Sequence, residues 1–265
     1  MRTKYEQIIA HIFFERYDGS ESGFNFPRSA INEAAESLGL KRISNVGDVI
    51  YTFRSRKQLP SSVRATAPAP KEWIIRTTAS GQYRFDLIAN ARFPVTLHLA
   101  ETRIPDSTPA LIQLYRQSDE QALLAIIRYN RLADIFTRLS CFSVQSHLRT
   151  SLNGTGQVEI DELYVGIDRR GAHYVLPVEV KSASDSLGYF QIENMFELCV
   201  QRFPNQIARP LAAQFVDDDL IAMFEFERAP DSAEITVALE RHYRLVPPHD
   251  LPPELIVEYG HRIED

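Results

Sequence analysis

One hairpin-like stretch constrains the fold of this chain more than any other feature. Two alternating segments, Val158–Ile167 and Tyr174–Lys181, flank a short Arg-Arg-Gly sequence, and such alternation is typical of β-strands. A three-residue hairpin loop usually ends in a left-handed residue, a position that suits Gly171. We therefore predict a β-hairpin that closes on a pair between Asp168 and Ala172.

The register of this hairpin brings charged side chains onto one face of the sheet. It places Asp161 opposite Glu179 and Glu159 opposite Lys181. The other face would carry apolar residues, namely Val158, Ile160, Val178 and Val180. A loop of two or four residues would shift the register and separate the charged pairs. Because like charges repel unless a cation lies between them, three carboxylates beside a lysine indicate a hard ion such as Mg²⁺.

These residues resemble a known motif. Asp161, followed on the neighbouring strand by Glu179-Val180-Lys181, is similar to the signature of the PD-(D/E)xK nuclease superfamily. The resemblance covers roughly residues 118–227. It implies a restriction-endonuclease-like α/β fold, with a mixed β-sheet flanked by helices. It also implies that Asp161, Glu179 and the Val180 carbonyl hold Mg²⁺, for which Mn²⁺ could substitute, and that Lys181 positions the attacking water.

Three further side chains are candidates for the same site. Some branches of the superfamily add a glutamine on the next helix, and Gln191 stands where that residue would be. The proline that precedes the aspartate in the family motif is Ile160 here, which leaves Glu159 as a rival metal ligand. Glu120, on a helix before the strands, is a second auxiliary candidate. The alternative interpretation is a solvated hairpin face with cross-strand ion pairs.

Periodicity divides the chain into two domains, expected over residues 1–90 and 110–265. Proline-rich Leu59–Lys71 is expected to be an extended, exposed linker. The first domain is predicted to contain helices over Tyr5–Arg16, Arg28–Leu38 and Asn45–Ser55, then strands over Trp73–Thr78 and Gln82–Ala89. The second is predicted to contain a broken helix over 110–139, strands over 142–149, 158–167 and 174–181, a helix over 187–203, and strands over 210–216, 220–227 and 235–244.

The first domain resembles a winged-helix module, because a helix, a turn and a second helix precede a strand pair. Basic residues concentrate there: residues 41–64 contain six Lys and Arg against Asp48 alone. The net charge of −6 hides this asymmetry. Residues 1–149 carry 20 basic and 14 acidic side chains, and the remainder 9 and 21. We expect contacts to double-stranded DNA from Lys41, Arg42, Asn45, Arg54, Arg56 and Lys57. A basic surface for protein contact is the alternative.

Together these features predict a Mg²⁺-dependent endonuclease of duplex DNA, most simply a sequence-specific type II restriction enzyme. Cleavage of both strands favours a homodimer. By the same resemblance, the products would carry 5′-phosphate and 3′-hydroxyl ends. The alternatives are a structure-specific repair or recombination nuclease and a non-enzymatic DNA-binding regulator. No apolar run is long enough for a membrane span, and two cysteines, expected as buried thiols, indicate a reducing cytoplasm.

Overall fold

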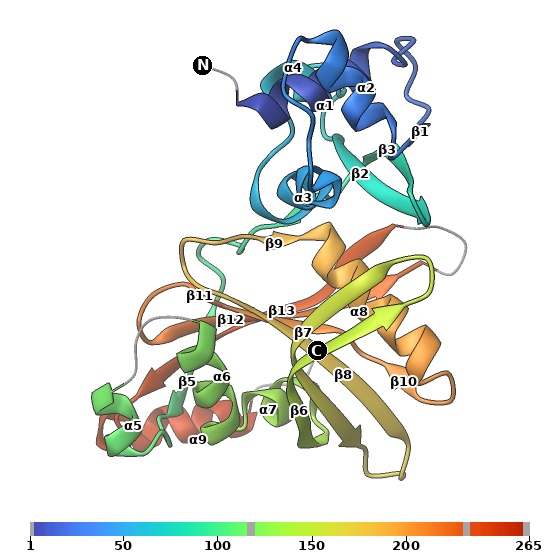
Figure 1. Cartoon of the computed structure of the whole chain (residues 1–265). Helices are drawn as coiled ribbons and strands as arrows, with labels where there is room; N and C mark the ends of the chain where they lie inside the picture. Colours follow the sequence, from blue (N-terminus) through green and yellow to red (C-terminus); the bar gives the residue numbers. More distant parts are fainter. Residues whose placement is uncertain (1–2, 116–119, 230–233, 262–265) are drawn as a thin grey trace.

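The computed structural model describes residues 3–115, 120–229 and 234–261, and it shows a smaller N-terminal part above a larger C-terminal part (Figure 1). All three helices expected in the N-terminal part are present. The elements of this part are α1 (Lys4–Phe14), β1 (Phe24–Pro27), α2 (Ala30–Ser37), α3 (Val46–Tyr51), a π-helical turn (Thr52–Arg56), α4 (Ser61–Arg64), β2 (Glu72–Ala79) and β3 (Gln82–Ile88).

The N-terminal part has its own hydrophobic core between its helices and a small sheet. The expected pair β2–β3 gains a third strand, β1, which pairs antiparallel with β3. Sequence patterning missed β1 because it is only four residues long. Its Phe26 is fully buried, and Phe13 of α1 packs edge-on against Phe85 of β3, with ring centroids 5.1 Å apart. The helices are therefore anchored to the sheet through aromatic rings.

The expectation that Leu59–Lys71 forms an extended, exposed linker is wrong for the start of this segment, although most of residues 64–71 are exposed. Its first half folds into α4 and packs on the N-terminal core, where Leu59 and Val63 are buried. Arg64 Nε also donates to the Leu59 carbonyl at 3.1 Å. Pro60 begins this helix, a position where its missing N–H is no loss. Pro60 thus marks a helix boundary, which the proline-rich composition did not reveal.

The C-terminal part is built on a large mixed sheet with the strand order β5-β13-β12-β11-β8-β7-β6, to which β10 adds beside β8. Strands β8 and β11 run parallel, as do β13 and β5. Its elements are β4 (Arg92–Phe93), β5 (Glu101–Pro105), α5 (Ala110–Tyr115), α6 (Glu120–Tyr129), α7 (Leu132–Thr137), β6 (Ser140–Leu152), β7 (Gly156–Ile167), β8 (His173–Lys181), β9 (Leu187–Gly188), α8 (Tyr189–Arg202), β10 (Ile207–Ala208), β11 (Leu211–Phe215), β12 (Leu220–Arg228), β13 (Ile235–Val246), a 3₁₀ turn (Pro248–Asp250) and α9 (Pro253–His261).

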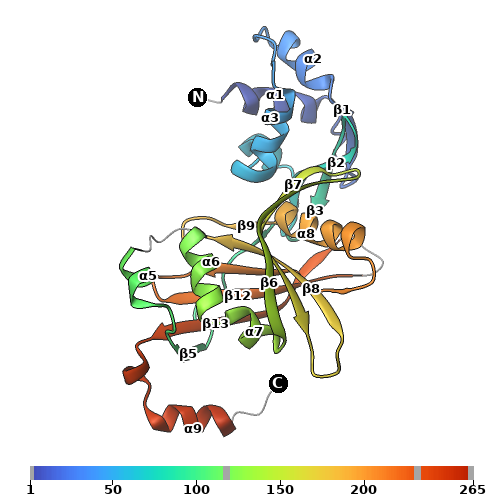
Figure 2. The same ribbon diagram turned by 60° about the horizontal axis from the view of Figure 1, so that its bottom comes forward.

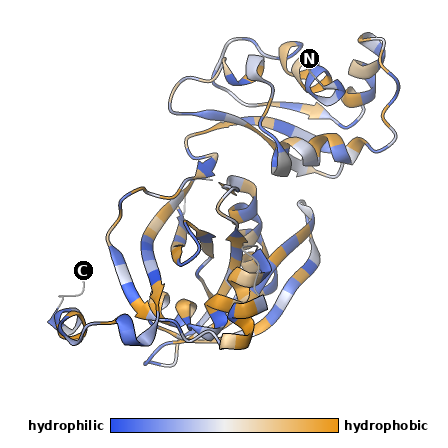
Figure 3. Cartoon of the chain, turned by 90° about the vertical axis from the view of Figure 1, so that its left-hand side faces the viewer, coloured by the Kyte–Doolittle hydropathy of each residue, from blue (hydrophilic) through white to orange (hydrophobic). Residues whose placement is uncertain are grey.

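Helices cover both faces of this sheet, which confirms the predicted mixed α/β class. Ile192 and Met195 of α8 belong to a buried cluster on one face. Leu123 and Ile127 of α6 belong to a second cluster on the other face. Figure 3 shows hydrophobic and hydrophilic residues alternating along the strands between these layers. Strand β8 lies inside the sheet between β7 and β11, so it is covered from all sides.

The central hairpin forms with the predicted loop. Asp168 N–H donates to the Ala172 carbonyl at 3.2 Å, and Gly171 adopts a φ of +83°. Strands β7 and β8 then pair in the expected register, but the pairing ends at Glu162 opposite Val178. Beyond that point, the β6–β7 hairpin curves away from β8 towards the N-terminal part (Figures 1 and 2).

This divergence overturns two details of the expected hairpin. Neither predicted charged pair forms in the ladder: Asp161 does not pair with Glu179, and Glu159 pairs with Arg149 of β6 instead of Lys181. The apolar residues of the two strands also do not share one face: Ile160 packs in the cluster beneath α8, whereas Val180 packs in the cluster beneath α6. Strand β6 is irregular beside this point, with a register shift between Ser143 and Gln145 and a positive φ at His147, and such bulges bend a ribbon and redirect its side chains.

The expectation for the cysteines is confirmed. Both cysteines, Cys141 and Cys199, are buried free thiols. Within the described ranges, the structure contains no helix with the length and apolar character needed to cross a bilayer.

Candidate functional site

The three motif residues meet where β7 separates from β8. Asp161 lies on β7, one residue beyond the last ladder pair, and Glu179 and Lys181 lie at the end of β8. The Val180 N–H donates to Asp161 Oδ2 at 2.9 Å, so a side chain of β7 now bonds to the backbone of β8. The separation of the strands thus opens space around Asp161 without detaching it from the motif strand.

Lys181 occupies the centre of the cluster. Its Nζ donates to Glu179 Oε1 at 2.8 Å, to the Val180 carbonyl at 3.0 Å and to Glu120 Oε1 at 3.2 Å. Burial alone would lower the pKa of this ammonium, but the neighbouring carboxylates outweigh burial and raise its pKa above the usual value. Lys181 is therefore a fixed positive charge at all physiological pH values.

Glu179 is almost completely buried, with 7% of its side chain exposed. Burial and the adjacent charge of Asp161 raise its pKa to about 8, against the opposing effect of Lys181. Burial likewise raises the pKa of Asp161, although the Val180 N–H and Lys181 act in the opposite direction. Asp161 and Glu179 thus lie side by side with raised pKa values, which indicates that the nearby positive charge does not fully balance their negative charge.

Gln191 belongs to the cluster and also to the start of α8. Its Nε2 donates to Glu179 Oε1, and its own Oε1 accepts the Gly188 N–H at 3.1 Å. The residue therefore caps the helix and orients the carboxylate with a single side chain. Asn194, one turn further along α8, lines the same groove, and its Oδ1 is buried without a hydrogen-bond partner.

The two auxiliary candidates differ in their contacts. Glu120, in the first turn of α6, reaches Lys181 and so joins the cluster from a separate element. Glu159 lines the groove but is half exposed and forms an ion pair with Arg149 at 3.0 Å. The structure thus places Glu120 in direct contact with the motif and leaves Glu159 at the rim.

Sequence reasoning gave no role in this site to His147, which lies on β6 across from Asp161. It stands between the pairs Ser146–Glu162 and Leu148–Ile160, and its φ of +49° is rare for a residue other than glycine. Its Nε2 lies 3.2 Å from Gln121 Oε1, and its charge when protonated lowers the pKa of Asp161. Only the register of β6 against β7 could have revealed this position.

A groove of about 1080 Å³ surrounds these residues. Five carboxylates and two basic side chains line it, which gives a formal charge of −3 with histidine neutral. The walls come from α6, β6, β7, β8, the 184–186 loop and α8, and Tyr51 of α3 contributes from the N-terminal part. An acidic groove of this kind attracts cations and disfavours a bare polyanion.

The oxygen atoms of this groove fit a hard divalent cation. Asp161, Glu179 and the Val180 carbonyl offer oxygen donors only, as Mg²⁺ requires. Among the described residues, no three His, Cys, Asp or Glu side chains gather closely enough to hold an ion alone, so water or phosphate oxygens would complete the coordination, which is usual for Mg²⁺. The Lys181 ammonium already bridges Glu179 Oε1 and the Val180 carbonyl, which shows that this position favours positive charge.

The basic residues expected to contact DNA occupy two kinds of environment. Lys41, Arg42, Asn45 and Lys57 are exposed. Arg54 is not: it donates to Thr77 Oγ1 at 2.9 Å and its guanidinium lies 4.4 Å from the centre of the Phe190 ring of α8. The side chain of Arg56 lies outside the described part of the structure. Arg54 therefore connects the two parts of the chain instead of lying on the outer surface.

Comparison with known proteins adds no further constraint. No family model matches the sequence, and neither the curated proteins nor the solved structures contain a match.

Proposed function

We propose that this protein is a Mg²⁺-dependent endonuclease of the PD-(D/E)xK type that hydrolyses phosphodiester bonds of duplex DNA. One observation carries the proposal: Asp161, Glu179 and Lys181 converge at a polar groove, at the end of a strand buried inside the sheet. A solvated hairpin face would leave these side chains exposed, yet Glu179 and Lys181 are only 7% and 12% exposed.

The surrounding topology supports the same assignment. The strand β6, the motif hairpin β7–β8 and the helix α8 follow one another, as the resemblance requires, and β11 then returns parallel to β8. Such a parallel crossover fixes the end of β8 beside the start of α8. The arrangement accounts for how Gln191 reaches Glu179.

Each polar residue has a distinct part in the proposed reaction. Asp161, Glu179 and the Val180 carbonyl would hold Mg²⁺, which supplies positive charge next to the scissile phosphate. Lys181 would position the attacking water and balance the negative charge that develops on the phosphate oxygens. Gln191 keeps Glu179 oriented through its amide, a role that requires no contact with the substrate.

The N-terminal part supplies a DNA-reading module in this proposal. Its order of three helices with a small sheet, β1-β3-β2, supports the winged-helix interpretation. Exposed Lys41 and Arg42 stand just before α3 and are suited to phosphate contacts. Tyr51 at the end of α3 lines the acidic groove, which links the reading element to the site of cleavage. A module that reads sequence favours a restriction-type enzyme, acting as a homodimer to cut both strands.

The direct test is incubation of the purified protein with plasmid DNA in Mg²⁺ or in EDTA. Discrete fragments in Mg²⁺ alone are expected, whereas cleavage confined to branched DNA would support a structure-specific repair nuclease. Lys181→Ala should retain DNA binding but lose cleavage, while Arg169→Gln, at the far tip of the β7–β8 loop, should cleave normally. Absence of Mg²⁺-dependent cleavage on duplex, branched and single-stranded DNA would refute the proposal and favour a non-enzymatic regulator.

A further inference from the structure

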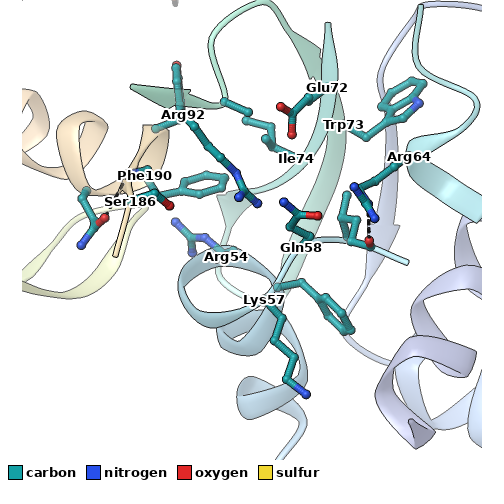
Figure 4. Close-up of a pocket in the computed structure, with 16 residues that line it drawn as sticks. Arg54, Lys57, Gln58, Arg64, Glu72, Trp73, Ile74, Arg92, Ser186 and Phe190 are labelled. Atoms are coloured by element: carbon teal, nitrogen blue, oxygen red, sulfur yellow. Dashed lines mark hydrogen bonds between the residues drawn. The ribbon is translucent and has the colours of Figure 1, made fainter. Parts of the chain in front are cut away.

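A second cavity lies at the junction of the two parts, beside the acidic groove. It is lined by the end of the π-helical turn, by strand β2, by β4 and by the start of α8. Figure 4 shows the guanidinium groups of Arg54 and Arg92 and the amide of Gln58 pointing into the same space, whereas the Lys57 ammonium points away from it. Donor groups from two separate segments, residues 54–58 and β4, therefore converge on one place.

The charge of this junction pocket is opposite to that of the groove. Four basic side chains and one carboxylate, Glu72, line it, which gives a formal charge of +3. Among the described residues, Arg92 has no carboxylate partner. Two of these cations, Arg54 and Arg92, point into the cavity, and such a convergence of guanidinium groups indicates a site for an anion.

Arg54 is the most firmly placed of these cations. Its guanidinium stacks on Phe190 and donates to Thr77, so its direction is fixed before any ligand arrives. Its Nε is buried without an acceptor. Burial lowers the pKa of Arg54, and the nearby charge of Glu193 does not fully offset this effect. A bound anion would supply the missing negative charge.

The pocket and the groove share a wall. Ser186 and Gln191 line both cavities, and Gln191 contacts Glu179 directly. The positive N-terminal end of α8, a helix of 14 residues, also faces the junction pocket through Gly188. A ligand that fills the groove therefore also borders the junction pocket.

We propose that the junction pocket binds a phosphate group of the DNA strand whose scissile bond lies in the acidic groove. This inference rests on the proposed function. The acidic groove needs a metal ion before it can accept a phosphate, whereas the junction pocket attracts one by itself. The pocket therefore anchors the strand next to the cleavage site without reading its sequence, because phosphates carry no sequence information.

Salt-dependent DNA binding tests the inference separately from cleavage. Fluorescence anisotropy with a labelled duplex in EDTA, at 50 to 250 mM KCl, gives the slope of log Kobs against log[KCl]. Each lost phosphate contact lowers that slope by about 0.9, which corresponds to about eightfold weaker binding at 0.1 M salt. Arg92→Gln should show this change for every duplex sequence, Arg92→Lys should retain most of the slope, and Arg169→Gln should match the wild type.

The outcomes separate three cases. An unchanged slope in Arg92→Gln refutes the pocket as a DNA-phosphate site. Stabilisation of the wild type by inorganic phosphate that is lost in Arg92→Gln, together with an unchanged DNA slope, also overturns it and assigns the pocket to a free phosphate. A lowered slope in a protein that cleaves no DNA supports the pocket and refutes the proposed nuclease function alone.

Discussion

Glu179 is a buried carboxyl whose replacement by glutamine should stabilise the metal-free protein. Burial and Asp161 raise its pKa to about 8, from an ordinary value of 4.5. As the pH rises above 4.5, the unfolded chain loses this proton while the folded protein keeps it, so the unfolded state gains stability relative to the folded state. The wild type should therefore become progressively less stable until the pH reaches about 8.

The size of the effect follows from the two pKa values. At pH 7, the pH is about 2.5 units above the pKa of the carboxyl in the unfolded chain, whereas the carboxyl in the folded protein is still protonated. Ionisation therefore stabilises the unfolded state by about 3 kcal/mol relative to the folded state. Glu179→Gln removes this penalty, and replacing the protonated carboxyl by an amide alters its hydrogen bonds with Lys181 and Gln191, at a cost of about 1.5 kcal/mol. Lys181 keeps its bonds to Glu120 and the Val180 carbonyl. We expect a net gain of about 1–2 kcal/mol, or about 2–8 °C in Tm.

The assay is thermal unfolding followed by circular dichroism in EDTA, at several pH values from 5 to 8. The gap in Tm between Glu179→Gln and wild type should widen as the pH rises. Glu159→Gln is the matched control, because this carboxylate lines the same groove but is half exposed, and its effect should stay within about 0.5 kcal/mol. A gap that is equal at pH 5 and pH 8, or a variant that melts below the wild type at pH 7.5, would refute the reasoning.

Three further substitutions test other contacts. Val63→Ala should cost about 1–3 kcal/mol, because the side chain is fully buried, and it should increase proteolysis of the proline-rich segment in a limited-digestion assay. Gln191→Leu removes the donor to Glu179 without adding charge and should lower the cleavage rate by about 10–100-fold, as measured in single-turnover assays against Mg²⁺ concentration. Arg76→Ala leaves the largely buried Glu193 unpaired and should cost about 1–3 kcal/mol in urea unfolding; no change in the midpoint would contradict the ion pair's role.

Local interactions made much of the fold predictable from the sequence. The loop between β7 and β8 is set by a type of turn that Gly171 permits, and the register of the following pairs depends on that loop alone. Most of the longer helices and strands of both parts were predicted because apolar spacing reports which face of each element is buried, whereas β1, α4, β5 and α9 were not. Asp161, Glu179 and Lys181 were found for the same reason: they belong to one hairpin.

Other parts of the site depend on contacts that no local pattern encodes. The register predicted Glu159 opposite Lys181, but the β7–β8 pairing ends at Glu162, where the β6–β7 ribbon bends away (Figure 2). His147 faces Asp161 only because of how β6 aligns with β7. The basic residues around Arg54 suggested that it lies on an outer DNA-binding surface. Instead, Arg54 packs against Phe190 and points into the junction between the two parts of the chain. Each of these differences comes from long-range packing.

The first two turns of α8 determine how far the two parts of the chain can be treated as interchangeable modules. Phe190 contacts Arg54, Gln191 contacts Glu179, and Glu193 contacts Arg76. Because a single stiff helix carries all three residues, the N-terminal part cannot shift against the sheet without breaking these contacts or displacing Gln191. A chimaera with a different N-terminal part would therefore inherit an intact β-sheet and an unsupported helix end. A designer who replaces the N-terminal part would have to keep Arg54 and Arg76 at the same positions against α8.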